Sequence, residues 1–463
     1  GATRDFALFT LALTYVRPDL AREMLLLSMR AQRANGKLPY GYAGFGGTGG
    51  YGLHSFSSDL DLFFLLAAAE YLGATGDHTL LDEEVLYYPP ERGRRGTGLD
   101  HLRASFHHLH AGVGQGPHGL LRAGTGDWND VWLGYSRLPM FTVLRGESAL
   151  NAAMATVALP MLADVIAARD EAFASRLRAL AAQQAEALRP LWMGTWMGRG
   201  YLGYGDAVLG RDRLFLDAQP WALLGGVWDT PRARALLRHI DAVCCRPQEA
   251  GALALWPPMR GPFLEEGVDT NGGTWAAVDS WLAWAWSAHD PAGAWRFFQS
   301  TTLAARARAH PDKWYGIWSG PDSYNAHYHA RAGETFDLNA TPMARFPVMN
   351  MNRHAGPLFN LVRFAGVAPR GGCIEVAPRV PGGRCQISTT LIDVDAAPDR
   401  LEVCYRPVAD GPVHFAAAPP PEAPAPRLLV DGAPQPFEMR PDGRVLFAVH
   451  AQRGRPVYWS LTR

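Results

Sequence analysis

The sequence predicts a mainly α-helical protein, with an (α/α)6 barrel over residues 1–368 and a small antiparallel β-sandwich domain over residues 369–463. Three observations favour this fold. Apolar residues recur at three- and four-residue spacing through the first part of the chain. Long glycine-rich loops separate these periodic segments. After Val367-Ala368-Pro369 the composition changes to short segments rich in β-branched residues. About a dozen helices separated by functional loops are typical of a helical toroid.

The expected helices are segments in which Ala, Leu and Arg fill the positions between periodic apolar residues. Long loops in a compact domain are usually functional, so the intervening loops are the first place to look for a site. Examples of the expected helices are residues 6–33, 59–72, 147–168, 171–188, 231–242, 274–288 and 291–309, and long intervening loops cover 40–51, 112–130 and 256–273.

The C-terminal part reads as strands separated by turn residues. Segments such as CIEVAP, LEVCYRPV and RVLFAVHA are broken by PGG, PDG and the tract PPPEAPAP. We interpret the proline tract as a stiff surface loop, with a partner-binding motif as the alternative. The resulting β domain is expected to pack on the barrel as a cap.

Composition excludes several classes of function. Lys+Arg and Asp+Glu are both 44, so the chain lacks the basic surplus of a general nucleic-acid binder or a polybasic membrane anchor. No apolar stretch is long enough to predict a membrane span. Five Cys without a CxxC pair, and no clean signal-peptide layout, indicate a reducing, cytoplasmic location, with the bacterial periplasm as the alternative.

The pentapeptide Gly126-Asp127-Trp128-Asn129-Asp130 concentrates polar chemistry in one loop. Glycosidic cleavage needs a carboxylic acid that protonates the leaving oxygen, together with groups that hold sugar hydroxyls. Carboxylates and amides suit those hydroxyls, and an indole offers a stacking face. A cluster that caps a helix N-terminus explains the same composition equally well.

The segment TGDWNDVWLGYSRLPMFTVLRGESALNAAM resembles the catalytic segment of cellobiose-phosphorylase-type enzymes, glycoside hydrolase family 94, in which GDWND is followed by GES at the start of a helix. Further blocks resemble the family in the right order. Thr3-Arg4-Asp5 resembles FRD, SSDLDLFFLLAAAEYLGATGD resembles SDDHLWL…EYI…TGD, residues 196–201 and 217–222 resemble WYLRAY and SQSWA, and Asn271-Gly272-Gly273 resembles ENGG.

The resemblance implies an (α/α)6 barrel with a C-terminal β-sandwich that acts on β-linked glucosides with inversion. It assigns the general acid to Asp130, although the residues themselves leave open which carboxyl of the loop is the acid. A short loop can aim one carboxyl inward while its neighbour, Asp127, is tied to backbone or to an arginine. The matched motifs imply a substrate site formed by Arg4, Asp5, Asp59, Asp127, Trp128, Asn129, Gln219, Asn271 and Trp275.

The chain departs from the family where phosphate should bind. Family phosphorylases use an Arg just upstream of FRD, a His after ENGG and a Thr-Gly pair. The first would precede residue 1, Ala277 stands where the His is expected, and Thr270 replaces the Glu of ENGG. RFPVMNMNRH replaces the Thr-Gly segment, and its Arg345, Arg353 and His354 offer an alternative phosphate site.

If phosphate is not the nucleophile, water needs a general base. Glu334 is favoured, because AGETFD at 332–337 resembles the EQFD segment of glucoamylases. A capping or surface carboxylate is the alternative for this residue. The remaining candidate bases are Glu265, Glu266, Asp269 and Asp337.

The sequence therefore predicts an inverting, exo-acting glycosidase that cleaves a β-linked glucoside or oligosaccharide, with Asp130 as acid and Glu334 as base. The alternatives are a phosphorylase that uses inorganic phosphate and an inactive carbohydrate-binding module. No cofactor or metal is expected, since the His-rich stretch 101–118 lacks metal-ligand spacing. Resemblance to the family also makes a homodimer a candidate oligomeric state of this protein.

The 15 Trp divide into two sets by their surroundings. Trp281, Trp284 and Trp286 have the spacing of a helix core. Others lie in or beside Gly- and Pro-rich loops, where a sugar could reach them. That loop set comprises Trp128, Trp256, Trp275, Trp314 and Trp318. The glycine-rich stretch 44–50, GFGGTGG, is interpreted as a mobile lid.

Overall fold

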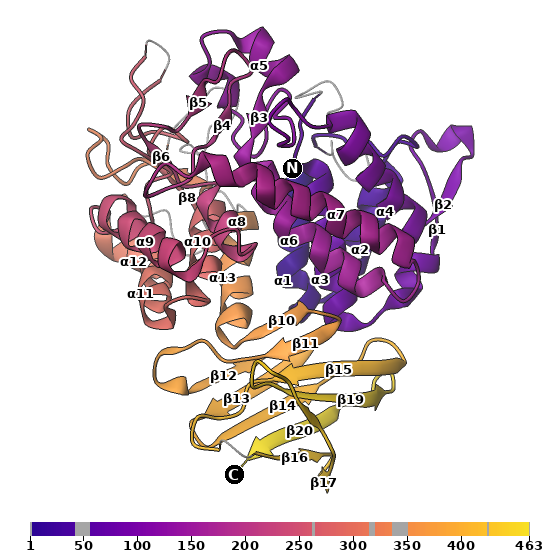
Figure 1. The fold of residues 1–463 in the computed structure, drawn as a ribbon. Helices are drawn as coiled ribbons and strands as arrows, with labels where there is room; N and C mark the ends of the chain where they lie inside the picture. The colour runs from indigo at the N-terminus through magenta and orange to yellow at the C-terminus, as the bar shows by residue number, and fades with distance from the viewer. Residues whose placement is uncertain are drawn as a thin grey trace.

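The structure is a computed structural model that describes residues 2–41, 56–261, 264–313, 320–335, 351–423 and 426–462. Helices dominate up to residue 364 and strands dominate after it (Figure 1). The α-helices are α1 Thr3–Val16, α2 Pro18–Ala31, α3 Leu60–Thr75, α4 Gly98–His107, α5 Pro139–Arg145, α6 Ala149–Ile166, α7 Glu171–Leu188, α8 Gln219–Leu224, α9 Thr230–Ile240, α10 Ala276–Ser287, α11 Pro291–Thr301, α12 Leu303–Ala309 and α13 Met351–Phe364.

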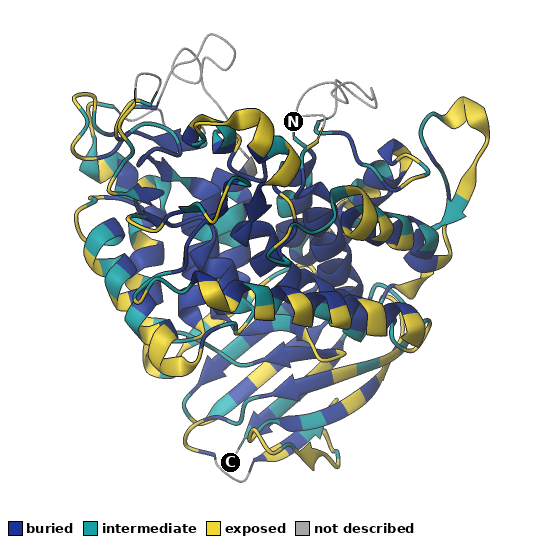
Figure 2. Cartoon of the chain, turned by 45° about the horizontal axis from the view of Figure 1, so that its top comes forward, coloured by how far each residue is buried: buried dark blue, intermediate teal, exposed yellow. Residues whose placement is uncertain are grey.

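Helices α1, α3, α6, α8, α10 and α13 contact one another in that order, and α13 returns to α1. The helices α2, α7 and α11 pack against α1, α6 and α10 respectively. Burial follows this arrangement, because α3 and α6 are buried on nearly every side whereas α7 buries one stripe (Figure 2). Apolar residues on all sides of α3 and α6 therefore reflect their central position.

Helix α6 is, among the described residues, the one long and apolar enough to cross a membrane by length and composition. Most of it is buried inside the protein, as in the core helix of a globular fold. The core beside it is rich in aromatic rings, and Trp281, Trp284 and Trp286 are all buried, which confirms their predicted core role. Trp281 lies 5.2 Å from Trp221, ring centre to ring centre.

Residues that read as loops form short sheets at the end of the helical part that lies away from the C-terminal strands (Figure 1). These sheets stiffen the loops that carry the sequence motifs. They are β3 Glu147–Ser148 with β4 Gly200–Tyr201 and β5 Val208–Leu209, β6 Leu214–Phe215 with β7 Leu255–Trp256, and β8 Thr274–Trp275 with β9 Ser323–Tyr324; a further hairpin pairs β1 Glu84–Leu86 with β2 Arg95–Thr97.

The C-terminal part forms two sheets. Their strands pair antiparallel as predicted, except that β11 and β15 are parallel. A five-stranded sheet has the order β10 Val367–Arg370, β11 Cys373–Val376, β15 Gly411–Ala417, β19 Val445–Ala451, β18 Glu438–Met439; a six-stranded sheet has the order β12 Cys385–Ser388, β13 Ile392–Ala397, β14 Arg400–Tyr405, β20 Val457–Thr462, β16 Arg427–Val430, β17 Ala433–Pro434.

The two parts are joined by buried polar contacts. The Tyr405 hydroxyl donates to the carbonyls of Ala74 and Thr75 at the end of α3, at 3.2 and 3.1 Å. Strand β10 follows α13 directly, and the Arg363 guanidinium of α13 donates to the Val367 carbonyl at 2.6 Å. Because these bonds satisfy groups at a helix end and a strand start, they fix the strands against the helices.

Candidate active site

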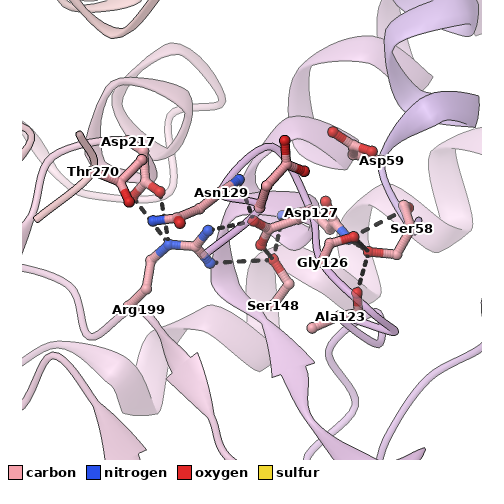
Figure 3. A network of polar contacts seen from close by, with 12 residues as sticks. Ser58, Asp59, Ala123, Gly126, Asp127, Asn129, Ser148, Arg199, Asp217 and Thr270 are labelled. Atoms are coloured by element: carbon pink, nitrogen blue, oxygen red, sulfur yellow. Dashed lines mark hydrogen bonds and ion pairs between the residues drawn. The ribbon is translucent and has the colours of Figure 1, made fainter. Parts of the chain in front are cut away.

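Asp127 lies at the centre of a fully buried polar network (Figure 3). Its carboxylate accepts hydrogen bonds from the Arg199 guanidinium at 2.6 Å, the Asn129 backbone N–H at 3.0 Å and the Ser148 hydroxyl at 2.5 Å. Arg199 also pairs with Asp217 at 3.0 Å. Asp127 is therefore tied to backbone and to an arginine, as predicted. Its side chain is buried, and its role as a direct substrate contact stays a prediction.

The Gly-Glu-Ser motif that follows this loop has a structural function. The Ser148 hydroxyl accepts from the Asn151 N–H at 3.0 Å and so caps the N-terminus of α6. Asn151 in turn donates to the Ser58 hydroxyl at 2.8 Å, and Ser58 donates to the Ala123 carbonyl at 2.8 Å. These bonds hold the starts of α3 and α6 against the loop that carries Asp127 and Asp130.

Asp130 is the carboxyl of this loop that solvent reaches, with 42% of its side chain exposed. One oxygen accepts from the Arg4 guanidinium at 3.1 Å and the other accepts from the Tyr40 hydroxyl at 2.8 Å. Arg4 is buried, lies 3.4 Å from Asp59 and donates to the Asp127 carbonyl at 3.0 Å. The arginine of the first helix therefore positions an exposed carboxyl.

Several carboxyls share the positive charge of Arg4. Burial alone would lower the pKa of Arg4, but the carboxylates of Asp59 and Asp130 outweigh it and raise that pKa. Burial raises the pKa of Asp59 to about 6, against the effect of Arg4. Burial also raises the pKa of Asp5, whose carboxylate accepts from the Asn352 amide at 3.0 Å. Burial therefore raises the proton affinity of both Asp59 and Asp5 above that of an exposed carboxyl.

Among the candidate bases that the structure describes, Asp269 interacts electrostatically with Asp130. Burial raises the pKa of Asp269 to about 6, and the charge of Asp130 adds to this effect. Its backbone is in the left-handed region, with φ of 55°, an uncommon conformation for a non-glycine residue. The other candidates have different partners: Glu265 pairs with His329 at 2.7 Å, Glu266 with Arg260 at 3.1 Å, Glu334 lies 4.0 Å from Lys313, and Asp337 is outside the described residues.

The amide side chains of Gln219 and Asn271 are bound to backbone. Gln219 accepts from the Met197 N–H and donates to the Met197 and Phe215 carbonyls. Asn271 accepts from the Met259 N–H and donates to the Met259 carbonyl at 3.0 Å. Both amides therefore shape the loops around the site, and their role as sugar ligands stays a prediction. Asn129 also uses its side-chain oxygen on backbone, accepting from the Val131 N–H at 3.1 Å.

Trp128 is buried, with only 6% of its surface exposed. Its ring meets those of Trp275 and Trp281 edge to face, each at 5.2 Å between centroids. Aromatic packing therefore covers the ring of Trp128, and its role in stacking on a sugar stays a prediction. Trp275 and Trp256 are half-buried, and Trp314 and Trp318 lie outside the described residues.

The structure describes two of the three alternative phosphate ligands, Arg353 and His354. Arg353 is buried, donates to the Pro321 and Thr301 carbonyls, and lies 4.9 Å from the centre of the Tyr324 ring. Burial lowers the pKa of His354, which disfavours the cation that would bind phosphate. The third candidate, Arg345, and the predicted lid at 44–50 lie outside the described residues.

The glycosyl hydrolase 94 superfamily, catalytic domain, matches residues 2–308. The chain belongs to this family. It is 28% identical to a solabiose phosphorylase of Paenibacillus borealis over 52% of this chain and 30% of that protein. It is 30% identical to a 3-O-beta-D-glucopyranosyl-beta-D-glucuronide phosphorylase of the same organism, over 44% of this chain and 26% of that protein. A cellobionic acid phosphorylase of Neurospora crassa is 26% identical over 52% of this chain and 30% of that protein. The chain thus spans less than a third of these relatives.

Two solved structures share the fold of this family 94 chain at low sequence identity. An uncharacterized conserved protein from Thermus thermophilus has a TM-score of 0.53 at 15% identity, covering 77% of this chain and 91% of its own. A Streptomyces avermitilis alpha-L-rhamnosidase complexed with L-rhamnose has a TM-score of 0.52 at 13% identity, covering 99% and 38%. At such identities the likeness concerns the fold alone.

Two residues of the family 94 site were missed by sequence reasoning. Tyr40 contacts Asp130 across 90 positions and stands only at the start of a glycine-rich stretch, so no local pattern marks it. Arg199 lies within a motif that matches the family, and that match was the available signal. In the described ranges no group of three or more His, Cys, Asp or Glu could hold a metal ion.

Proposed function

We propose that the protein is an inverting glycoside phosphorylase. Asp130 would donate its proton to the glycosidic oxygen as the bond to the anomeric carbon breaks. An oxygen of inorganic phosphate would attack that carbon from the opposite face and form a sugar 1-phosphate. The observation that carries this proposal is the exposed Asp130 carboxyl, held by buried Arg4 and by Tyr40, in a family 94 chain whose curated relatives are phosphorylases.

The sugar of the non-reducing end would lie against Arg4, Asp5 and Asp59. A carboxyl with a pKa near neutrality, such as Asp59 at about 6, can accept from or donate to sugar hydroxyls. We expect a β-linked glucoside with a small acceptor. Phosphate would serve as substrate, no cofactor enters the proposal, and we place the reaction in the cytoplasm.

We also infer that the helical part is an (α/α)6 barrel. The closed sequence of contacts from α1 through α13 supports an inner ring, and α2, α7 and α11 would belong to the outer ring. The domain boundary would fall at the start of the C-terminal sheets, near residue 368, within strand β10. The motif loops would then lie at the end of the barrel away from those sheets (Figure 1).

Hydrolysis is the second candidate. Ala277 stands where the family has its phosphate-binding His, and Asp269 has a raised pKa and interacts with Asp130. Under this alternative Asp269 would activate a water, and the two carboxyls of an inverting pair would lie roughly 6.5–9.5 Å apart. Glu334 remains the base favoured by sequence alone.

A phosphate-dependence assay separates these functions. The protein is incubated with a panel of β-linked glucosyl disaccharides, with and without inorganic phosphate, and products are resolved by chromatography. We expect a sugar 1-phosphate that forms only with phosphate. Free glucose produced at equal rates in both buffers would support hydrolysis instead. No turnover of any substrate would support an inactive binding module.

A further inference from the structure

A cavity of about 460 Å³ adjoins the catalytic loop on the side of α4 and α5. Ligand pockets occupy roughly 300–1,000 Å³, so the volume suits a small molecule. Its polar lining includes Asn35, Lys37, Ser57, His108 and Arg122. No Asp or Glu is among the described residues that line it. We call it the basic cavity, because the charged side chains among its described lining residues are all basic.

The basic cavity is separate from the proposed catalytic centre but shares a wall with it. Arg4, Asp130 and Tyr40 do not line it. Ser57, which does, donates its hydroxyl to Asp59 at 2.9 Å and bridges by backbone to the catalytic loop at Gly124. A ligand that contacts Ser57 in the cavity would therefore be separated from Asp59, a carboxyl of the proposed sugar site, by the Ser57 side chain alone.

His108 is oriented by a buried carboxylate. Its Nδ1 lies 2.7 Å from Asp61, which also accepts from the Ser105 hydroxyl at 2.6 Å. Burial alone would lower the pKa of His108, but the Asp61 carboxylate outweighs it and raises that pKa. With Nδ1 engaged, Nε2 is the remaining ring nitrogen, and it lies beside Gly112, where a side-chain Cβ would approach it to 3.2 Å. Gly112 thus leaves room for the ring at the cavity wall.

Lys37 contributes a second cation in an unfavourable setting. Burial lowers the pKa of Lys37, and the charge of Arg33 adds to that effect. Its ammonium lies 5.5 Å from the centre of the Phe56 ring, another lining residue. An anion in the cavity would stabilise this charge, that of Arg122 and that of protonated His108 together.

We propose that the basic cavity binds a small oxyanion, the phosphate ion or the carboxylate of a sugar acid, through Lys37, His108 and Arg122. Cations around a cavity without acids give charge-assisted hydrogen bonds to such a group. Apolar Val143 and Leu144 of α5 complete the lining and suit the carbon skeleton of a sugar acid. This site is additional to the centre at Asp130.

The test is calorimetric titration of the whole protein with inorganic phosphate and, separately, with gluconate. The test variant is Lys37→Gln/Arg122→Gln. The control, Arg92→Gln/Arg95→Gln, removes the same charge from the exposed residues around the β1–β2 hairpin. We expect saturable binding of at least one probe, at least tenfold weaker binding by the test variant, and unchanged binding by the control. Arg122 is exposed, so single Arg122→Gln should fold normally and should itself weaken binding at least threefold.

The two titrations identify the source of the oxyanion. Because phosphate is also the proposed substrate at Asp130, the source is the probe whose binding weakens in Lys37→Gln/Arg122→Gln: phosphate alone supports a phosphate site, and gluconate alone supports a sugar-acid site. The proposal is overturned if neither probe saturates the wild-type protein. It is equally overturned if both Lys37→Gln/Arg122→Gln and Arg122→Gln bind as tightly as wild type, since the anion then sits elsewhere. The titration measures binding and not turnover. Its result can therefore be interpreted even if the protein proves to have no phosphorylase activity.

Discussion

At the residue scale, the proposed role of Asp130 as the general acid can be tested by kinetics. General acid catalysis contributes roughly 10²–10⁴-fold in rate, so Asp130→Asn should lower kcat by that range on a disaccharide. The same variant should lose far less on an aryl glucoside whose leaving group needs no proton. Steady-state kinetics with both substrates checks this, with exposed Asp399→Asn as control. Equal losses on both substrates would remove the acid role.

Tyr40 tests the positioning of that acid. Its hydroxyl donates to Asp130 at 2.8 Å, and a hydrogen bond to a charged group contributes roughly 1.5–3 kcal/mol. Tyr40→Phe should therefore lower kcat about tenfold or more with little change in KM. The exposed Tyr458→Phe, on the C-terminal sheet, serves as control. If kcat is unchanged while the melting temperature falls, Tyr40 has only a structural role.

Asp279 makes stability depend on pH. It is buried beside Arg353 and Arg306, and burial raises its pKa to about 6, above the unfolded value of about 3.9. The folded state therefore holds the proton more tightly, and the stabilisation is lost as pH rises from about 4 to about 6. Urea denaturation of Asp279→Asn should show a gain relative to wild type of up to about 3 kcal/mol across that window and a constant difference above it. A difference that is flat from pH 4 upward would contradict the assignment.

At the element scale, local signals located most helices but not their breaks. The predicted helix 6–33 divides into α1 and α2 because Pro18 occupies the first position of α2. Helix α3 runs three residues beyond the predicted end and stops at Gly76, whose φ is 66°. The short helix α8 was missed because six residues are too few to show periodicity.

The candidate site shows the same division between local and distant information. The chemistry of five consecutive residues points to this loop, and the resemblance to the family assigns the acid role to Asp130 within it. The contacts of Tyr40 and Arg199 with this loop span 90 and 72 positions, so only the fold reveals them. The burial of Trp128 depends on distant residues for the same reason. Trp281 of α10 packs against its ring, and no pattern within the loop of Trp128 predicts that contact.

Gly73 permits helix α3 to approach strand β10. A Cβ at this position would lie 2.5 Å from the Pro369 Cβ. Alanine favours helix by roughly 1 kcal/mol over glycine, but overpacking costs about 1–3 kcal/mol, so Gly73→Ala should destabilise the protein on balance. Chemical denaturation of Gly73→Ala, Pro369→Gly and the double variant measures the coupling. If the two changes in the free energy of unfolding simply add, the Gly73–Pro369 contact does not cause the loss of stability.

At the scale of the whole molecule, Glu70 joins three elements. Its carboxylate accepts from Tyr15 of α1 and Arg363 of α13, each at 2.5 Å, and all three side chains are buried. Removing one partner of a buried pair costs about 3–5 kcal/mol. Glu70→Gln should lower the free energy of unfolding by that amount, whereas exposed Glu438→Gln should not. A loss below about 1 kcal/mol would show that the network contributes little.

The hydrogen bond from Asn352 to Asp5 spans 347 positions, and it brings α13 to the helix that carries Arg4. On the ribosome, a chain grows at about 5–20 residues per second, so α1 waits on the order of tens of seconds for this partner. Until then the side of α1 that packs against α13 has no covering helix, although α2 and α3 already contact other parts of α1. Translation must pass α13 before the Arg4–Asp130 pair has its complete setting. Enzymatic activity would therefore report completed synthesis of the helical part.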